Sequence, residues 1–213
     1  MEILKKIAQY LEVGDDAGVP PLVRQALAEG LVAKTVLDDG LIAGMNTVGE
    51  KFRVHEIFLP DVLLAAKAMY AGMDVLKPLL ASSGVSSRGR VVIGSVHGDL
   101  HDIGKNLVGI MLKGAGFEVI DLGNDVAAEK FVAAAKDHDA CVIGMSALLT
   151  TTMPVMKEVV DLLKKENLSA KIKTIIGGAP VSQSYAGEIG VDAYGYDCAQ
   201  AVAGVKKLAA AVQ

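Results

Sequence analysis

The sequence contains no tryptophan, few aromatic residues and only two cysteines. Aromatic side chains make up 4% of the 213 residues and hydrophobic residues make up 52%, so we expect a core of aliphatic side chains. The two cysteines, Cys141 and Cys198, form no disulfide or zinc-binding pattern. We therefore expect both thiols to stay reduced, which indicates the cytoplasm.

Long apolar runs and an excess of basic charge are also missing. No apolar stretch approaches the length of a membrane span, and residues 1–6 predict the start of an amphipathic helix without the apolar core of a signal peptide. The net charge of −4 argues against a nucleic-acid-binding surface. These features favour a protein that binds neither membranes nor nucleic acid.

A polar stretch that contains glycine divides the chain into parts with different patterns. Residues 84–89 are predicted to link a first domain, 1–83, to a second domain, 90–213. The first domain has a helical pattern throughout, with its last two helices expected at about 33–52 and 59–80. Short connections between these helices predict an antiparallel four-helix bundle.

The second domain alternates apolar strands with helical segments, which is typical of a parallel sheet covered by helices. We therefore expect an α/β fold with a five-stranded, Rossmann- or flavodoxin-like sheet. The strands are predicted at residues 90–96, 117–122, 140–145, 172–176 and 191–194.

The segment after the first strand carries the most specific signal. It lies in a strand-to-helix loop at the carboxyl end of the strand, where open α/β sheets bind their ligands. His101 has the surroundings of a metal ligand, with Asp99 as the carboxylate that holds its other nitrogen and Gly104 leaving room for a bulky group. A lone loop histidine is more often only solvated or hydrogen-bonded, so the assignment depends on the rest of the chain.

Two phosphate-binding patterns are excluded in this segment. Gly98 and Gly104 enclose five residues, and Asn106 follows Lys105 where a P-loop requires a serine or threonine. No G-x-G-x-x-G sequence occurs. A nucleotide phosphate is therefore not the predicted ligand.

Two later segments end at the same edge of the predicted sheet. The third strand runs into Ser146 and Leu148, and the fourth runs into Gly177 and Gly178. Between Gly104 and Ser146 lie 41 residues, and between Leu148 and Gly177 lie 28. The order D-x-H-x-x-G, S-x-L and G-G at these separations resembles the cobalamin-binding domain of methionine synthase and the corrinoid proteins of methyltransferase systems.

The resemblance implies a cofactor, cobalamin or a related cobamide, and a role for each matching residue. In that family a protein histidine replaces the cofactor's benzimidazole as the lower cobalt ligand, and the displaced nucleotide tail enters a slot in the sheet. His101 is then the metal ligand, and Asp99, His101 and Thr152 form a catalytic relay in which Thr150 is the nearest competitor of Thr152. The residues implied to bind the cofactor are Gly98, Asp99, Leu100, His101, Asp102, Ile103 and Gly104 near the metal and Ser146, Leu148, Thr150, Gly177 and Gly178 along the tail.

The first domain resembles the helical cap of the same family. In that cap, bulky apolar residues press on the upper face of the corrin ring, and the resemblance gives this role to Phe52, Leu59 and Val62, with Met69 as a looser candidate. Apolar residues at helical spacing more often belong to a core, and this alternative stays open. The segments that carry the resemblance are 44–52, 56–63 and 65–69.

The resemblance implies a methyl carrier that is not catalytic on its own. Such a protein accepts a methyl group on Co(I) from a donor-specific methyltransferase and passes it from methyl-Co(III) to an acceptor methyltransferase of the thiol or tetrahydrofolate type. A reductive activase is a further expected partner. The donor is left open among methanol, methylamines, betaines and aryl methyl ethers, because it binds the partner enzyme and not this chain.

Two other classes of cobalamin protein share parts of the pattern. A cobalamin-dependent sensor or regulatory module has the same bundle and sheet but normally also an output domain, for which we expect no residues here. A small subunit of an adenosylcobalamin mutase shares D-x-H-x-x-G but has no reason to carry a cap with Phe52 and Leu59. The methyl carrier is the favoured hypothesis.

Overall fold

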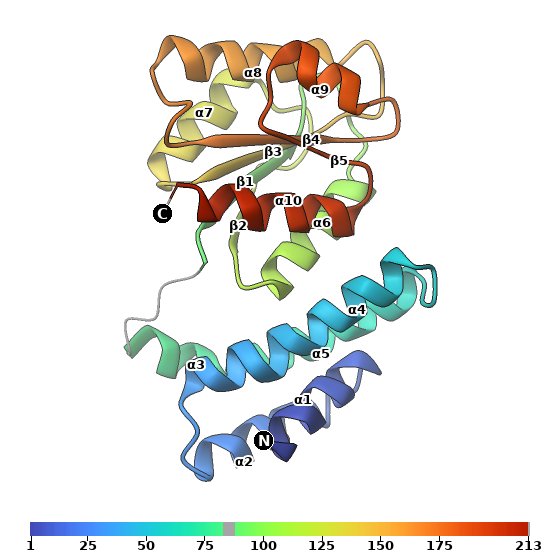
Figure 1. Cartoon of the computed structure of the whole chain (residues 1–213), viewed down its shortest axis with the longest axis vertical. Helices are drawn as coiled ribbons and strands as arrows, with labels where there is room; N and C mark the ends of the chain where they lie inside the picture. The colour runs from blue at the N-terminus through green and yellow to red at the C-terminus, as the bar shows by residue number, and fades with distance from the viewer. Residues whose placement is uncertain (83–87, 213) are drawn as a thin grey trace. The chain divides into compact units, whose positions relative to one another are not determined.

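The computed structural model describes residues 1–82 and 88–212 of the chain. These residues form two compact units, one made of helices and one built on a parallel sheet (Figure 1). The predicted linker at 84–89 falls mostly on residues outside the described ones, so the predicted domain boundaries stay predictions. Within the described residues, no helix has the length and apolar character that a membrane crossing requires.

The helical unit forms from segments whose apolar residues recur on one face. In the first helix, Ile3, Leu4, Ile7 and Leu11 are all buried, as expected for an amphipathic helix that packs on its neighbours. The second helix has prolines in its first turn, where a missing backbone N–H removes no helical hydrogen bond. The helices of this unit include α1 (Glu2–Glu12), α2 (Val19–Ala28), α3 (Ala33–Val36), α4 (Ala43–Arg53) and α5 (Leu59–Ser82).

The helix predicted at 33–52 is a continuous helical run with one wider section. A π-helical segment, η1 (Leu37–Ile42), connects α3 to α4. The pattern of apolar residues did not reveal it, because a single wider turn hardly disturbs a 3.6-residue period. Gly40 lies in this segment, and an added Cβ there would lie 3.2 Å from Cγ2 of Ile7 in α1. The missing side chain therefore lets η1 pack closely on α1.

The second unit contains the five-stranded parallel sheet that the sequence predicted. Its strand order is β2-β1-β3-β4-β5, the order of flavodoxin-like folds. The predicted α/β class is confirmed, and each strand lies within two residues of its expected position. The strands are β1 (Arg90–Ser95), β2 (Glu118–Asp121), β3 (Val142–Ser146), β4 (Lys173–Gly177) and β5 (Ala193–Gly195).

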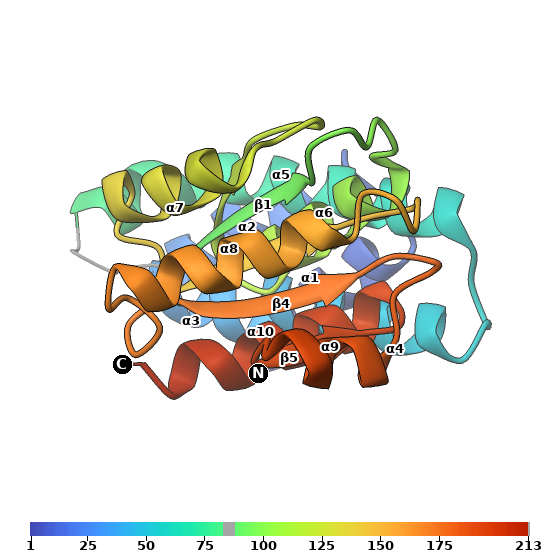
Figure 2. The same cartoon turned by 90° about the horizontal axis from the view of Figure 1, so that it is seen from above.

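Helices cover both faces of the sheet (Figure 1). On one face, α7 and α8 lie side by side (Figure 2), and Phe131 and Met156 of these helices pack with Ile143 and Ile176 of the strands in one buried cluster. α6 and α10 cover the opposite face. The helices of this unit are α6 (Ile103–Gly114), α7 (Ala128–Asp137), α8 (Pro154–Lys165), α9 (Gln183–Ile189) and α10 (Cys198–Ala210).

The strand order determines where a ligand site forms. β1 pairs with both β2 and β3, and the chain reverses its direction of winding between β1 and β3. In such sheets the loops that leave the two central strands diverge to opposite faces and open a crevice at their carboxyl ends. The loop after β1 carries His101 and the loop after β3 carries Thr152, so both leave the carboxyl ends of these central strands.

Candidate functional site

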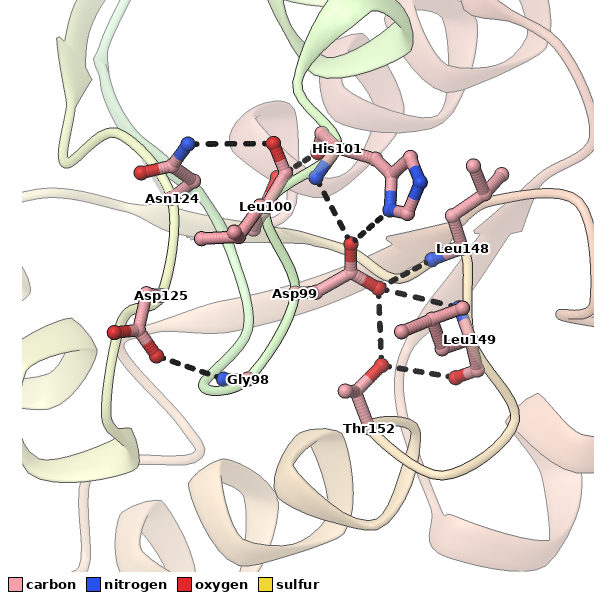
Figure 3. A network of polar contacts seen from close by, with 10 residues as sticks. Gly98, Asp99, Leu100, His101, Asn124, Asp125, Leu148, Leu149 and Thr152 are labelled. Carbon is pink, nitrogen blue, oxygen red and sulfur yellow. Dashed lines mark hydrogen bonds and ion pairs between the residues drawn. The ribbon is translucent and has the colours of Figure 1, made fainter.

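The carboxylate of Asp99 is the centre of a polar network between the loops after β1 and β3 (Figure 3). Its Oδ1 lies 3.0 Å from the backbone nitrogen of His101 and 2.8 Å from His101 Nδ1. Its Oδ2 accepts hydrogen bonds from the backbone amides of Leu148 at 2.7 Å and Leu149 at 3.2 Å, and from Thr152 Oγ1 at 3.0 Å. The side chain is fully buried, so this one carboxylate joins the two loops away from solvent.

These contacts determine the charge of Asp99. Burial acts to raise the pKa of its carboxyl, because an ion is less well solvated inside the protein. The hydrogen bonds from the amides of Leu148 and His101, from the His101 ring and from the Thr152 hydroxyl act to lower it, and together they outweigh burial. The pKa of Asp99 is held well below its usual range, so the carboxylate is ionised at neutral pH.

The ionised carboxylate selects the tautomer of His101. A carboxylate only accepts hydrogen bonds, so the Nδ1 atom that faces Asp99 carries the proton and Nε2 keeps its lone pair. Figure 3 shows the second ring nitrogen turned away from Asp99, and the side chain is 52% exposed. No described residue bonds Nε2. The ring is therefore oriented and held as histidine ligands of metals generally are.

Thr152 is the hydroxyl that the structure brings to this network. Besides Asp99 Oδ2, its Oγ1 lies 2.9 Å from the carbonyl oxygen of Leu149, and the residue is buried. Thr150, the competing candidate, is exposed and has no recorded bond to the carboxylate. Asp99, His101 and Thr152 thus form a connected series of hydrogen bonds.

Large apolar side chains lie exposed on both sides of His101. Leu100 and Ile103 are 69% and 76% exposed, and Leu148 and Leu149 of the facing loop are exposed as well. At Gly104, an added Cβ would meet no atom within 4 Å. A half-exposed histidine with a free ring nitrogen, amid apolar residues and open space, fits a metal carried in a large, mostly apolar macrocycle.

The remaining residues near His101 mainly shape the loop. Gly98 has a φ of 80°, which favours glycine, and its amide is bonded to Asp125 Oδ1 at 2.8 Å. The carbonyl of Asp102 accepts the amide of Asn106 at 2.7 Å, which is the first helical hydrogen bond at the start of α6. Among the described residues, no cluster of three or more His, Cys, Asp or Glu side chains is placed to hold a metal ion.

Gly177 and Gly178 have a packing role that the sequence did not reveal. Gly178 has a φ of 127°, and an added Cβ would lie 1.8 Å from the carbonyl oxygen of Ala147. An added Cβ on Gly177 would lie 2.9 Å from the carbonyl oxygen of Gly195. Both glycines are required by close backbone contacts, while Ser146 beside them is half-buried. Their part in a slot for the nucleotide tail stays a prediction.

The apolar residues predicted for the cap differ in accessibility. Val62 and Met69 are buried, whereas Phe52 and Leu59 are only half-buried. Phe58, which the sequence analysis did not select, is 67% exposed immediately before α5. Phe52 and Leu59 are thus better placed than Val62 to meet a ligand, and the role of all three stays a prediction.

Sequence reasoning also missed two supports of the His101 loop. The fully buried Ser95 donates a hydrogen bond from Oγ to the carbonyl oxygen of His101 at 2.6 Å. The loop after β2 supplies Asn124, whose Nδ2 bonds the carbonyl of Leu100 at 3.3 Å, and Asp125, which bonds Gly98. Ser95 ends a strand and Asn124 and Asp125 lie in a loop where such residues are common, so no motif in the sequence distinguishes these three.

Comparison with known proteins agrees with this geometry. Residues 89–203 match a family model described as a B12 binding domain, and residues 3–77 match a second model with the same description. The chain is 44% identical over 210 residues to dimethylamine corrinoid protein 1 of Methanosarcina acetivorans, covering 98% of each chain.

Two solved structures are similar over nearly the whole chain. One is a cobalamin-binding protein of Desulfitobacterium hafniense, with 34% identity, a TM-score of 0.80 and coverage of 96% of this chain and 98% of that one. The other belongs to a methanol:cobalamin methyltransferase complex of Methanosarcina barkeri, with 34% identity, a TM-score of 0.86 and coverage of 98% and 80%. The predicted family and cofactor are confirmed: the chain belongs to the family of B12-binding corrinoid proteins.

Proposed function

We propose that this chain is a corrinoid methyl carrier. It accepts a methyl group from a donor-specific methyltransferase and passes it to an acceptor methyltransferase. The relatives named for dimethylamine and for methanol support this role, since both names belong to methyl-transfer systems. When bound, the cobalt of the cobamide supplies the nucleophile and the site of methyl attachment, and the protein supplies ligation, orientation and access.

The observation that carries the proposal is the pairing of His101 with the buried Asp99. The carboxylate holds the ring through Nδ1 and leaves Nε2 directed outward as a metal ligand. Its negative charge also makes the imidazole a stronger donor, because a hydrogen bond to an ion polarises the ring. His101 would therefore hold the cobalt when the cofactor is bound, with Asp99 as its positioning residue.

Asp99 stays ionised because four protein groups besides the ring stabilise its charge. The carboxylate therefore holds the His101 ring in one orientation through Nδ1.

The proposed partners are suggested by the relatives, one of which belongs to a methyltransferase complex. The donor and acceptor are presented by separate methyltransferases, and a reductive activase restores the reduced cobalt. A donor panel of methanol, methylamines, betaines and aryl methyl ethers, each with a candidate methyltransferase, identifies the donor. Both cysteines are free thiols, as a reducing compartment keeps them, and we place the carrier in the cytoplasm.

The test is isotopic. Protein that contains ¹⁵N-histidine is reconstituted with cobalamin of natural abundance and reduced to Co(II) for EPR spectroscopy. We expect the nitrogen superhyperfine triplet of ¹⁴N to become the doublet of ¹⁵N, and His101→Ala to lose the histidine coupling. A triplet that persists in the labelled protein identifies the cofactor's own benzimidazole as the ligand and overturns the assignment.

A second arm tests the carrier role. The reconstituted chain alone should demethylate no donor, and turnover should require a methyltransferase on each side. Catalytic demethylation of a donor by the purified chain alone contradicts the proposal.

A further inference from the structure

Lys105 is a buried charged residue that the proposed function does not use. It lies in the first turn of α6, four residues after His101, and its side chain is only 4% exposed. A buried ammonium near a helix N-terminus is unfavourable in two respects: it loses its hydration, and it faces the positive end of the helix dipole. Compensating contacts are therefore expected around it.

The structure provides these contacts. The ammonium Nζ lies 2.6 Å from both carboxylate oxygens of Asp121 and 2.7 Å from Oδ1 of Asn106. An ammonium has three donors, and three acceptor oxygens surround it. Lys105 consequently has no donor left for a phosphate or another ligand, and its contacts are directed at Asp121.

Asp121 connects Lys105 to the loop after β2. It is the last residue of β2, and its Oδ1 also accepts the backbone amide of Gly123 at 2.9 Å. The carboxylate thereby closes a tight turn over residues 121–123, in which Gly123 has a φ of 82°. Neutralisation of Asp121 by Lys105 holds this turn against α6.

The loop that starts at this turn supports the His101 loop at successive positions (Figure 3). The carbonyl of Gly123 accepts the amide of Ser95 at 3.0 Å, and the amide of Asp125 donates to the carbonyl of Asp99 at 3.0 Å. Asp125 Oδ1 also accepts the amide of Gly98, and Asn124 bonds the carbonyl of Leu100. Residues 95–100 are thus fixed from one side by residues 123–125.

We propose that Lys105 is a positioning residue of the cobalt-ligand site, which acts through Asp121 and the 121–125 loop to hold Asp99 and His101 in register. This proposal rests on the proposed function for its cobalt readout. The contacts that connect Lys105 to the 121–125 loop, and this loop to the His101 loop, are present without the cofactor. They can therefore be tested in the cofactor-free protein.

The first readout is amide hydrogen exchange in the cofactor-free full chain. Lys105→Met keeps an unbranched side chain that is one atom shorter and removes the charge, and Asp121→Asn removes the partner charge. In each we expect the amides of Gly98 and Asp125 to exchange about tenfold faster, because the local opening that exposes them becomes easier when a supporting contact is lost. Lys113→Met, on the exposed end of the same helix, is the matched control and should leave both amides unchanged.

The second readout is the fraction of Co(II) that has histidine nitrogen as its ligand, measured by EPR in the reconstituted protein. We expect this fraction to fall in Lys105→Met and Asp121→Asn. Thr174→Val is a control for stability alone. It removes the Thr174–Asp192 hydrogen bond near the amino end of β4, whereas His101 follows the carboxyl end of β1. It should lower stability without a change in ligation.

A double variant with Lys105→Met and Asp121→Asn tests whether Lys105 acts through Asp121. If Lys105 acts through Asp121, the double variant should be no worse than either single variant, because both remove the same interaction. If Lys105→Met does not fold, Asp121→Asn carries both readouts.

Unchanged exchange at Gly98 and Asp125 overturns the proposal. So does a histidine-ligated fraction that changes equally in Thr174→Val, because Lys105 then contributes only to stability. Should the parent protein show no histidine coupling at all, the proposed function fails, and hydrogen exchange still decides the role of Lys105.

Discussion

One carboxylate oxygen of Asp99 binds His101 twice, through the ring nitrogen Nδ1 at 2.8 Å and through the backbone amide at 3.0 Å. The ring and the backbone of the same residue are therefore positioned by a single buried atom. The other oxygen of this carboxylate binds the loop after β3. The orientation of His101 consequently depends on two loops that leave different strands, which makes the effects of substitutions here specific.

Replacing Asp99 should weaken ligation without emptying the site. Asp99→Asn keeps the shape of the side chain but loses the charge, so His101 becomes a poorer and less well-oriented donor. We expect the affinity of His101 for cobalt to fall about 10–100-fold. EPR should show this as a smaller fraction of Co(II) with a histidine ligand. Asp137→Asn, at the exposed end of α7, is the control, and equal spectra for the two variants would reduce Asp99 to a loop-capping residue.

Thr152→Ala should change ligation in the same direction but by less. A neutral hydroxyl contributes a weaker hydrogen bond to the network than a charged partner does. The measurement is the fraction of Co(II) with histidine nitrogen as its ligand, by EPR of the reconstituted protein, which should fall by less than in Asp99→Asn. Thr151→Ala, on an exposed side chain next to it, should leave this fraction as in the parent. A lower fraction in Thr150→Ala in place of Thr152→Ala would show that the relay has a different third member.

Asp99 should also make stability depend on pH in a defined direction. The pKa of its carboxyl is lower in the folded protein than the value of about 3.9 in an unfolded chain. A group with a depressed folded pKa stabilises the native state fully above the unfolded pKa, and this contribution is lost as the pH falls below about 4.

We therefore expect Asp99→Asn to lower the free energy of unfolding by about 3 kcal/mol at neutral pH. Urea unfolding of parent and variant from pH 7 down to acid should show this difference constant at first and then shrinking below about pH 4. A difference that is the same at pH 7 and pH 3 would mean that the charge of Asp99 is not what stabilises the fold.

Gly178 should tolerate no side chain, unlike a glycine in an open position. At Gly178 an alanine would combine a left-handed backbone with a Cβ 1.8 Å from the carbonyl oxygen of Ala147. We expect Gly178→Ala to lower the free energy of unfolding by about 3 kcal/mol or more. Gly187→Ala in α9, where an added Cβ meets no atom within 4 Å, should instead raise it by about 0.5–1 kcal/mol. Chemical denaturation of the cofactor-free protein measures both.

The type of fold and the place of the His101 loop in it could be predicted because they depend on local patterns. Apolar runs alternating with helical periods led to five parallel strands, and each was found within two residues of its expected place. The sequence D-x-H-x-x-G directly after a strand placed His101 at the carboxyl edge of the sheet before any contact was known. The apolar run of a strand and the period of a helix are properties of neighbouring residues, so sequence reasoning reaches them.

Contacts between distant segments were decided only by the tertiary structure. Thr152 and the amides of Leu148 and Leu149 meet Asp99 across 49 to 53 residues of sequence, and no pattern within either loop distinguishes Thr152 from Thr150 beyond the resemblance. The burial of Lys105 against Asp121 was hidden for the same reason, since each residue alone is unremarkable in a loop or helix end. Local sequence determines which backbone elements form, whereas the partner of a buried polar group is determined by the packing of the whole sheet, because only the folded chain removes water from that group.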